Sequence, residues 1–335
     1  MKLAGQSTVL RLTVLSAPLL AALLAAFAFG PYPLSPAEAL AALWAGPSAE
    51  SDAATVMWQL RLPRILAGLL VGAALSAAGA AYQGMFRNPL VSPDILGVSA
   101  GAGLGAALAI YFGLSLAAVQ ALAFAGGLLA VAAVVFVAGR VRRHDPVLVL
   151  VLAGVAVGTL FGAGISLVKV LADPSVQLPS ITFWLLGGLN AVSPGDLVLA
   201  APLVAMGLLP MALLRWRVNL LSLSDEEAAA LGVNVARLRS TLIVSATLVT
   251  AAAVSIAGVV GWIGLVVPHA VRLLVGPEFS RLLPASLLLG GGFLVAADTL
   301  ARSAAAIELP LGILTALVGA PVFLWLLARP GRGGT

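Results

Sequence analysis

The sequence predicts an all-α polytopic membrane protein with about ten transmembrane helices. Of its 335 residues, 61% are hydrophobic and 9% are charged, and the mean hydropathy is +1.11. This composition excludes both a soluble globular domain and a disordered chain. Apolar runs long enough to cross a bilayer recur along the whole chain, separated by short polar stretches. We therefore expect one transmembrane domain over residues 1–335, embedded in a lipid bilayer.

The stretch from Arg61 to Gly105 predicts a helical hairpin. After RLPR it runs without a charge from Ile65 to Ala81, which is long enough to cross most of the hydrocarbon. A turn rich in Asn, Ser and Pro follows Arg87, and a second apolar segment begins at Ile95. Glycines four residues apart in both segments favour close helix packing in lipid.

The same criteria apply to the rest of the chain. A segment over 9–29 is longer than the apolar core of a signal peptide, so we expect it to be retained as a span. The remaining predicted spans are 64–84, 95–112, 116–138, 147–170, 196–214, 239–257, 259–275, 283–301 and 310–328.

Positive charges support an even number of spans with both termini in the cytoplasm, because cytoplasmic loops collect Lys and Arg. With ten spans, fourteen basic residues lie on one side and four on the other. The cytoplasmic set is Lys2, Arg11, Arg87, Arg140, Arg142, Arg143, Arg215, Arg217, Arg237, Arg239, Arg272, Arg281, Arg329 and Arg332. The outer set is Arg61, Arg64, Lys169 and Arg302.

Two segments do not fit the pattern of spans. Residues 174–190 have a short apolar core closed by two glycines, which predicts an interfacial or re-entrant helix on the outer side. Residues 219–239 form the most polar internal stretch and should lie in the cytoplasm. There Ser224 precedes Glu227 by three residues, as in a capping box, and Gly232 can end the helix. A short cytoplasmic helix is predicted.

The sequence lacks the residues that several kinds of binding and catalytic site require. Neither of the two lysines follows a glycine, so no P-loop for ATP exists, and there is no cysteine for a thiolate site. We expect no catalytic, metal or cofactor site in this chain, and the scattered arginines do not predict nucleic-acid binding. Asp298 is the best candidate for ion coupling in a secondary transporter, followed by Lys169. Asp298 can instead pair with Arg302 on the same helix, and Lys169 can reach the surface.

The motifs together resemble the permease subunits of type II ABC importers, the FecCD-like family that imports iron-siderophores, haem, cobalamin and similar complexes. The matching stretches are 61–64 (RLPR), 79–103, 184–189 (WLLGGL), 219–233, 261–273, 282–302 and 308–327. They occur in family order and cover most of the chain.

The resemblance implies a homodimer, two cytoplasmic ATPase subunits that bind ATP and Mg²⁺, and a binding protein that docks outside. Residues 219–239 would then form the loop that couples transport to ATP hydrolysis. The implied coupling residues are Ser224, Asp225, Glu226, Glu227, Leu231 and Gly232. A plain connecting helix is the alternative, because capping boxes are common.

The resemblance also implies sites elsewhere. Arg61, Arg64 and Arg302 match the arginines that contact acidic residues of the binding protein; headgroup contact or an Arg302–Asp298 pair is the alternative. The translocation path and dimer interface would involve Gly154, Gly158, Gly162, Leu309, Pro310 and Gly312.

The predicted function is that of a permease in an ATP-driven importer of the bacterial cytoplasmic (inner) membrane, working by alternating access. An iron(III)-siderophore is the expected cargo, with haem, cobalamin and molybdate as alternatives. A secondary transporter or channel without an ATPase is the alternative function. A membrane-embedded enzyme would need a polar cluster at one depth, and the sequence offers none.

Overall fold

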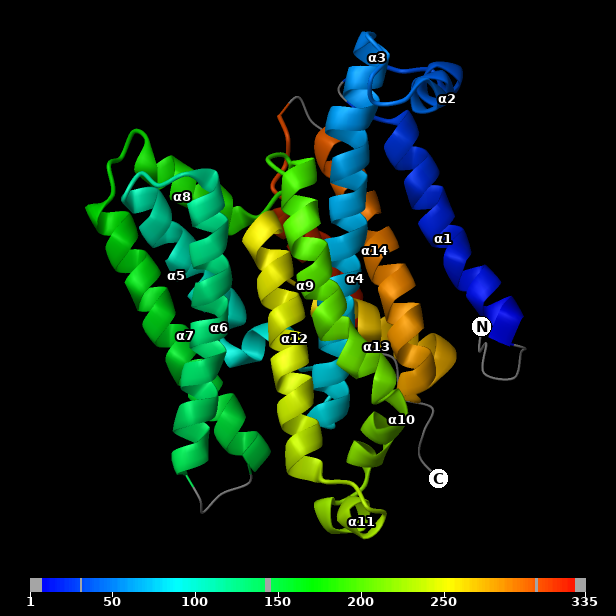
Figure 1. The fold of residues 1–335 in the computed structure, drawn as a ribbon. Helices are drawn as coiled ribbons and strands as arrows, with labels where there is room; N and C mark the ends of the chain where they lie inside the picture. Colours follow the sequence, from blue (N-terminus) through cyan, green and yellow to red (C-terminus); the bar gives the residue numbers. More distant parts are fainter. Residues whose placement is uncertain (1–7, 31, 142–145, 305–306, 329–335) are drawn as a thin grey trace.

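The computed structural model describes residues 8–30, 32–141, 146–304 and 307–328, and every regular element in these ranges is a helix (Figure 1). The long helices run side by side and alternate in direction. At one end lie two short helices, α2 (Pro36–Ala45) and α3 (Asp52–Thr55), and at the other lies α11 (Asp225–Ala230). We call these the α2 end and the α11 end.

Each predicted span corresponds to a helix, which confirms the fold class. Six described helices are long and apolar enough to cross a membrane, and four are shorter apolar helices. The ten are α1 (Thr8–Ala28), α4 (Leu62–Met85), α5 (Val98–Tyr111), α6 (Leu116–Arg140), α7 (Pro146–Leu171), α9 (Pro194–Leu213), α12 (Val235–Ala257), α13 (Ile263–Val275), α14 (Phe279–Ser303) and α15 (Leu311–Ala328).

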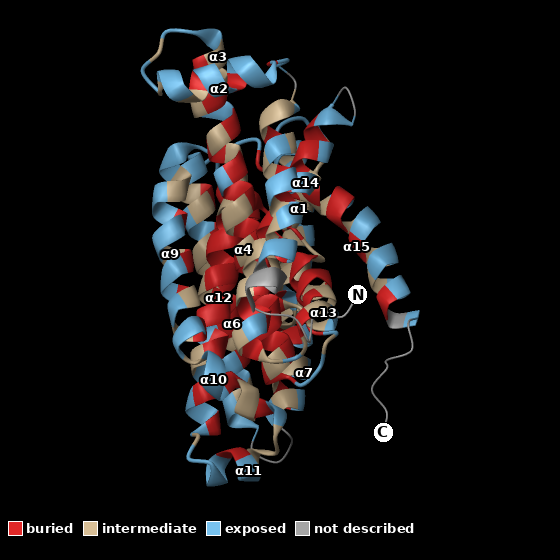
Figure 2. Ribbon diagram, turned by 90° about the vertical axis from the view of Figure 1, so that its right-hand side faces the viewer, coloured by how far each residue is buried: buried red, intermediate tan, exposed pale blue. Residues whose placement is uncertain are grey.

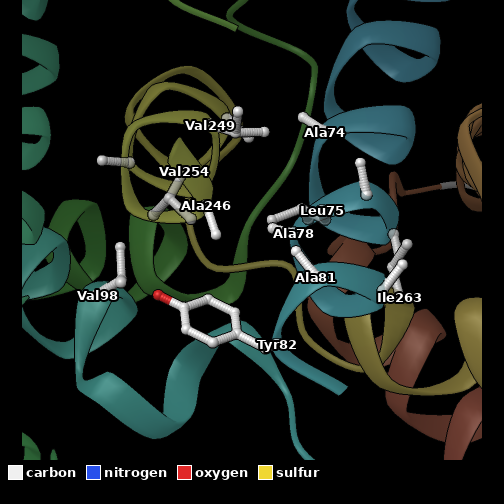
Figure 3. Packing of buried hydrophobic residues seen from close by; sticks show 14 of the residues in the cluster. Ala74, Leu75, Ala78, Ala81, Tyr82, Val98, Ala246, Val249, Val254 and Ile263 are labelled. Atoms are coloured by element: carbon white, nitrogen blue, oxygen red, sulfur yellow. The ribbon is translucent and has the colours of Figure 1, made fainter. Parts of the chain in front are cut away.

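Helices α4 and α12 form the centre of the bundle. In the most apolar part of the continuous helical stretch Asp52–Met85, 78% of residues are buried (Figure 2). The corresponding share is 22% in α7, which lies at the edge of the bundle (Figure 1). The facing surfaces of α4 and α12 carry mainly alanine, with Tyr82 between them and its hydroxyl 3.4 Å from that of Thr247 (Figure 3). Small side chains let the two backbones approach closely.

Glycines set the closest helix contacts, as the sequence predicted. A Cβ atom on Gly72 of α4 would lie 2.2 Å from the carbonyl oxygen of Gly290 in α14. On Gly79 it would lie 1.8 Å from the carbonyl oxygen of Gly264 in α13. Any larger residue at these positions would push the helices apart.

The second half of the predicted hairpin differs from the expectation. Instead of a helix from residue 95, a 3₁₀ helix, η3 (Pro93–Leu96), precedes α5, and Gly97 between them has φ 77°. This left-handed conformation favours glycine and separates the two helices. Figure 1 shows the chain passing from the lower end of α4 to the middle of the bundle before α5 begins.

The two predicted short helices are present. Helix α8 (Gln177–Leu186) lies within 174–190, and α11 lies within 219–239. Before α11, the short helix α10 (Arg215–Val218) leads into a 3₁₀ turn, η4 (Asn219–Ser222). The helix that forms the seventh predicted span, α12, begins at Val235, four residues before the predicted start at residue 239. The Asn234 side chain accepts a hydrogen bond from the Arg237 amide and caps that helix.

Helix α2 was not predicted. Its capping box, in which the Ser35 hydroxyl accepts from the Glu38 amide and the Glu38 carboxylate accepts from the Ser35 amide, was readable in the sequence. A helical stretch, α3 followed by the π-helical turn η2 (Val56–Arg61), also extends α4 beyond the predicted span.

Among the described arginines, the distribution over the two ends follows the predicted sides. Arg87, Arg140, Arg215, Arg217, Arg237, Arg239, Arg272 and Arg281 lie near helix termini at the α11 end, and Arg61, Arg64 and Arg302 near termini at the α2 end. Lys2, Arg142, Arg143, Arg329, Arg332 and the side chain of Arg11 lie outside the described residues, as do the two termini.

Candidate coupling helix, arginine cluster and translocation path

Helix α11 carries the predicted capping box. The Ser224 hydroxyl accepts a hydrogen bond from the Glu227 amide at 3.2 Å, and the Glu227 carboxylate accepts one from the Ser224 amide at 2.9 Å. Hydrogen bonds from the Ser224 amide and from the Ser224 hydroxyl lower the pKa of the Glu227 carboxyl group. Gly232 has φ 82° and ends the short helix in a left-handed turn. A helix of this length needs such caps to persist.

The predicted coupling residues divide between two surfaces. Glu226, Glu227, Leu231 and Gly232 are exposed, and the side chain of Leu231 is an apolar group at 61% exposure. Asp225 instead faces the bundle, where Arg239 and Arg87 hydrogen-bond to its carboxylate and lower its pKa. Sequence reasoning missed both contacts, because neither the 14 positions from Asp225 to Arg239 nor the 138 positions from Arg87 to Asp225 match a spacing that places side chains side by side.

The three predicted docking arginines lie together at the α2 end. Arg64, on the first turn of α4, donates to Asp298 of α14 at 2.8–3.0 Å and to Glu308 at 3.1 Å. Arg302 lies on the other side of Asp298, with its Nε 3.5 Å from that carboxylate. The Asp298–Arg302 pair considered from the sequence is therefore present, but Arg64 is the closer partner.

Arg61 and Arg302 bind backbone carbonyls in the last turn of α1, and Arg61 also binds one just beyond that helix. Arg61 donates to the carbonyl oxygens of Phe27 and Tyr32, and Arg302 donates to that of Ala26 at 2.7 Å. Arginine side chains suit this position because the last carbonyls of a helix carry partial negative charge. The two residues are 4% and 7% exposed, and in this structure their guanidinium groups donate to carbonyls within the chain. Docking at these residues stays a prediction.

Two of the predicted glycines of α7 contact η3 and the Gly97 that follows it. A Cβ on Gly154 would lie 2.0 Å from the carbonyl oxygen of Ile95, and one on Gly158 would lie 3.9 Å from the Cα of Gly97. Gly162 has no heavy atom within 4 Å of such a Cβ. Two of the three glycines therefore pack within the chain, and Gly162 is the one with open space beside it.

The start of α15 closes one wall of a cavity of about 290 Å³. Leu309 and Pro310 line it, opposite the ends of α8 and α12. Gly312 packs on the C-terminal carbonyl of α8, since its Cβ would lie 2.5 Å from the carbonyl oxygen of Leu186. The Leu311 amide donates to the carbonyl of Gly187 at 3.0 Å. These predicted path residues therefore meet α8 and the end of α12 near the α2 end.

A family model described as the FecCD transport family matches residues 18–329, nearly the whole chain. The chain belongs to this family. The resemblance seen in the motifs is thereby confirmed, and the FecCD protein is a permease subunit of an ABC transporter.

Relatives of this FecCD protein carry several different cargo names. A probable iron chelatin transport system permease of Helicobacter pylori is 44% identical over 83% of this chain and 84% of its own. The molybdate import system permease MolB of Haemophilus influenzae is 40% identical over 91% of each chain. The vitamin B12 import system permease BtuC of Escherichia coli O157:H7 is 38% identical over 96% of this chain and 95% of its own.

A solved structure supports the same assignment. It is described as a metal-chelate type ABC transporter in an inward-facing conformation, and it superimposes on the FecCD chain with a TM-score of 0.87 at 37% identity, covering 95% of this chain and 99% of the other. A secondary transporter or channel that works alone is therefore not favoured.

Proposed function

We propose that the chain is the permease of a bacterial inner-membrane importer for a metal chelate, with an iron(III) chelate such as a siderophore as its first cargo. Two cytoplasmic ATPase subunits bind ATP and Mg²⁺ and act on α11. A homodimer of the permease forms the translocation path, and a binding protein delivers cargo at the α2 end, beside Arg61, Arg64 and Arg302. Both termini lie in the cytoplasm.

The observation that carries this proposal is the form of α11. It is a capped helix at one end of the bundle, it presents an exposed leucine, and it is anchored to α4 and α12 through Asp225. Since the sequence offers no P-loop, the energy for uphill import has to come from another protein. A rigid exposed helix joined to the spans gives that protein a point of attachment.

The side chains on the two helices proposed to border the path suit a large cargo that must be released. Exposed side chains on α7 and α15 are mainly apolar, including Leu160, Leu167 and Leu317. A path lined by many charged ligands would hold a chelate too tightly. ATP binding and hydrolysis shift the equilibrium between the outward-facing and inward-facing states. The size of the shift is set by how differently the two states bind the nucleotide-bound ATPase. The 44% identical relative named for iron chelatin transport favours an iron chelate among the cargoes.

The test is purification of the chain in mild detergent from cells that co-express its candidate ATPase subunits. We expect Mg²⁺-dependent ATP hydrolysis to copurify with the wild-type chain and to fall at least about tenfold for Leu231→Asp. Ile307→Asp is the matched control, because Ile307 is also an exposed apolar residue but lies near the α2 end, 75% exposed against 61% for Leu231. A chain that carries solute with no ATPase bound would overturn the proposal.

The cargo follows from the same preparation. A binding protein that stimulates the ATPase identifies the cargo through the ligand it binds, measured by titration with an iron(III) siderophore, haem, cobalamin and molybdate. We expect stimulation to be lost in Arg64→Glu, the most accessible of the three arginines. Tight binding of molybdate alone would contradict the proposed cargo but not the importer.

A further inference from the structure

The carboxylate of Asp225 joins two transmembrane helices. Arg239, in the first turns of α12, forms a two-pronged contact with it, Nη1 to Oδ2 at 2.7 Å and Nη2 to Oδ1 at 2.8 Å. Arg87, just beyond α4, donates from Nη2 to Oδ1 at 3.0 Å. Because a forked contact fixes orientation as well as distance, Asp225 sets the angle at which α11 leaves the bundle.

Arg87 reaches this position at a conformational cost. Its φ is 51°, and in the described part of the chain Trp262 is the only other non-glycine residue with positive φ. The residue after a helix cap commonly adopts this left-handed conformation, and it is then usually glycine. The side chain of Arg87 explains why glycine does not stand here, since its Nε also donates to the carbonyl oxygen of Leu221 at 2.6 Å.

The same residue begins the segment that enters the middle of the bundle. Beyond Arg87 the chain runs to η3, whose Ile95 carbonyl packs against Gly154 of α7. Gly97 then lies against Gly158, with 3.5 Å between its would-be Cβ and the Gly158 Cα. Residues 87–97 thus form one continuous segment, which contacts the base of α11 through the Arg87 side chain and packs on α7 at its other end.

We propose that Arg87 is a positioning residue for energy coupling, which ties α11 to the 87–97 segment and through it to α7. The proposal rests on the proposed function, in which the ATPase acts on α11. When the ATPase displaces α11, the contacts to Asp225 and Leu221 move residue 87, and η3 moves with it against α7. The glycine contacts place the backbone of η3 and Gly97 directly against α7, so a displacement of η3 is passed to that helix.

The discriminating variant is Arg87→Gly. If residue 87 served only to end α4, glycine would serve at least as well, because it adopts positive φ without cost. If Arg87 is a positioning residue, its loss should raise the number of ATP molecules hydrolysed per cargo imported at least about fivefold in proteoliposomes. The ATPase should still copurify. Arg140→Gly is the matched control, an exposed arginine ending α6 at the same end, with no ion-pair partner among the described residues.

A cycle of variants tests whether the contacts act together. The effects of Arg87→Gly and Asp225→Asn on this ratio should not add in the double variant, since both changes remove the contact between Arg87 and Asp225. Hydrogen exchange should speed up in both 225–231 and 93–97 for Arg87→Gly. An unchanged ratio and unchanged exchange at 93–97 would overturn the role of Arg87. Failure of the wild-type chain to bind an ATPase would instead overturn the proposed function, and the coupling role with it.

Discussion

Arg64 of α4 and Asp298 of α14 are joined by three hydrogen bonds, from Nε to both carboxylate oxygens and from Nη2 to Oδ1, at 2.8–3.0 Å. The side chain of Asp298 is 4% exposed and has Arg302 as a second neighbour. Arg302 in turn holds the end of α1 through the Ala26 carbonyl. One buried carboxylate therefore organises three helices, which accounts for Asp298 without an ion-coupling role.

Replacing Asp298 by Asn should destabilise the chain by about 3–5 kcal/mol, because removal of one partner leaves buried guanidinium groups without their anion. Glu308→Gln is the control: it removes an acid from the same arginine, but its side chain is 35% exposed, so a loss of about 1 kcal/mol or less is expected. Thermal unfolding in detergent measures both variants. Equal losses of stability in the two variants would show that the burial of the Asp298 pair does not determine its contribution to stability.

Gly79→Ala should separate α4 from α13. The new methyl carbon would stand 1.8 Å from the Gly264 carbonyl oxygen, so a backbone shift costing about 1–3 kcal/mol is expected. Gly84→Ala on the same helix is the control, since its methyl would meet only the Val218 side chain at 3.6 Å. The difference in melting temperature between the two variants tests the argument, and a stable Gly79→Ala protein would refute it.

Gly162→Leu should leave the fold of a single chain intact, because no atom lies within 4 Å of its Cβ direction. If the open face of α7 is the predicted dimer contact, the variant should shift the protein from dimer towards monomer in light scattering of the detergent complex. Gly139→Leu on α6, which also has open space beside it, is the matched control. A dimer that tolerates Gly162→Leu as well as the control would place the interface elsewhere.

Acidification should loosen α11 only well below neutral pH. The pKa of Asp225 is lowered by Arg239, and that of Glu227 by the Ser224 amide. A carboxyl group whose folded pKa is depressed stabilises above its unfolded pKa, and the stability is lost as the pH falls through the folded value. Exchange protection of 225–231 should therefore hold from pH 7 to 5 and fall below about pH 4. Asp225→Asn should show a smaller change, and loss of protection already at pH 6 would contradict the assignment.

Much of the fold could be predicted because lipid imposes simple rules. Backbone groups in hydrocarbon must be satisfied within the helix, so apolar length alone marks a span. The capping boxes of α11 and α2 were equally readable, since they depend on residues three positions apart. The break at Gly97 was not predicted, because a left-handed glycine between two helices looks in sequence like any glycine of a span.

The candidate sites could be located by motif but not by contact. The coupling residues were placed on the right helix, yet the division between exposed Leu231 and anchored Asp225 depends on two arginines, 14 and 138 positions from Asp225. For the arginine cluster, the sequence suggested a pair within α14, since partners four residues apart on a helix are neighbours. The preferred partner of Asp298 came instead from α4.

The sequence by itself therefore determined the helical membrane class, the ten apolar segments, the charge asymmetry and the capped helix α11, all of which follow from local length, period and spacing. Only the tertiary structure decided which glycines touch another backbone, which carboxylate each arginine binds and how α11 is tied to α4 and α12. These contacts join residues far apart in the chain, such as Arg64 and Glu308, which are separated by 244 positions. They are fixed by how the helices pack, which no local pattern encodes.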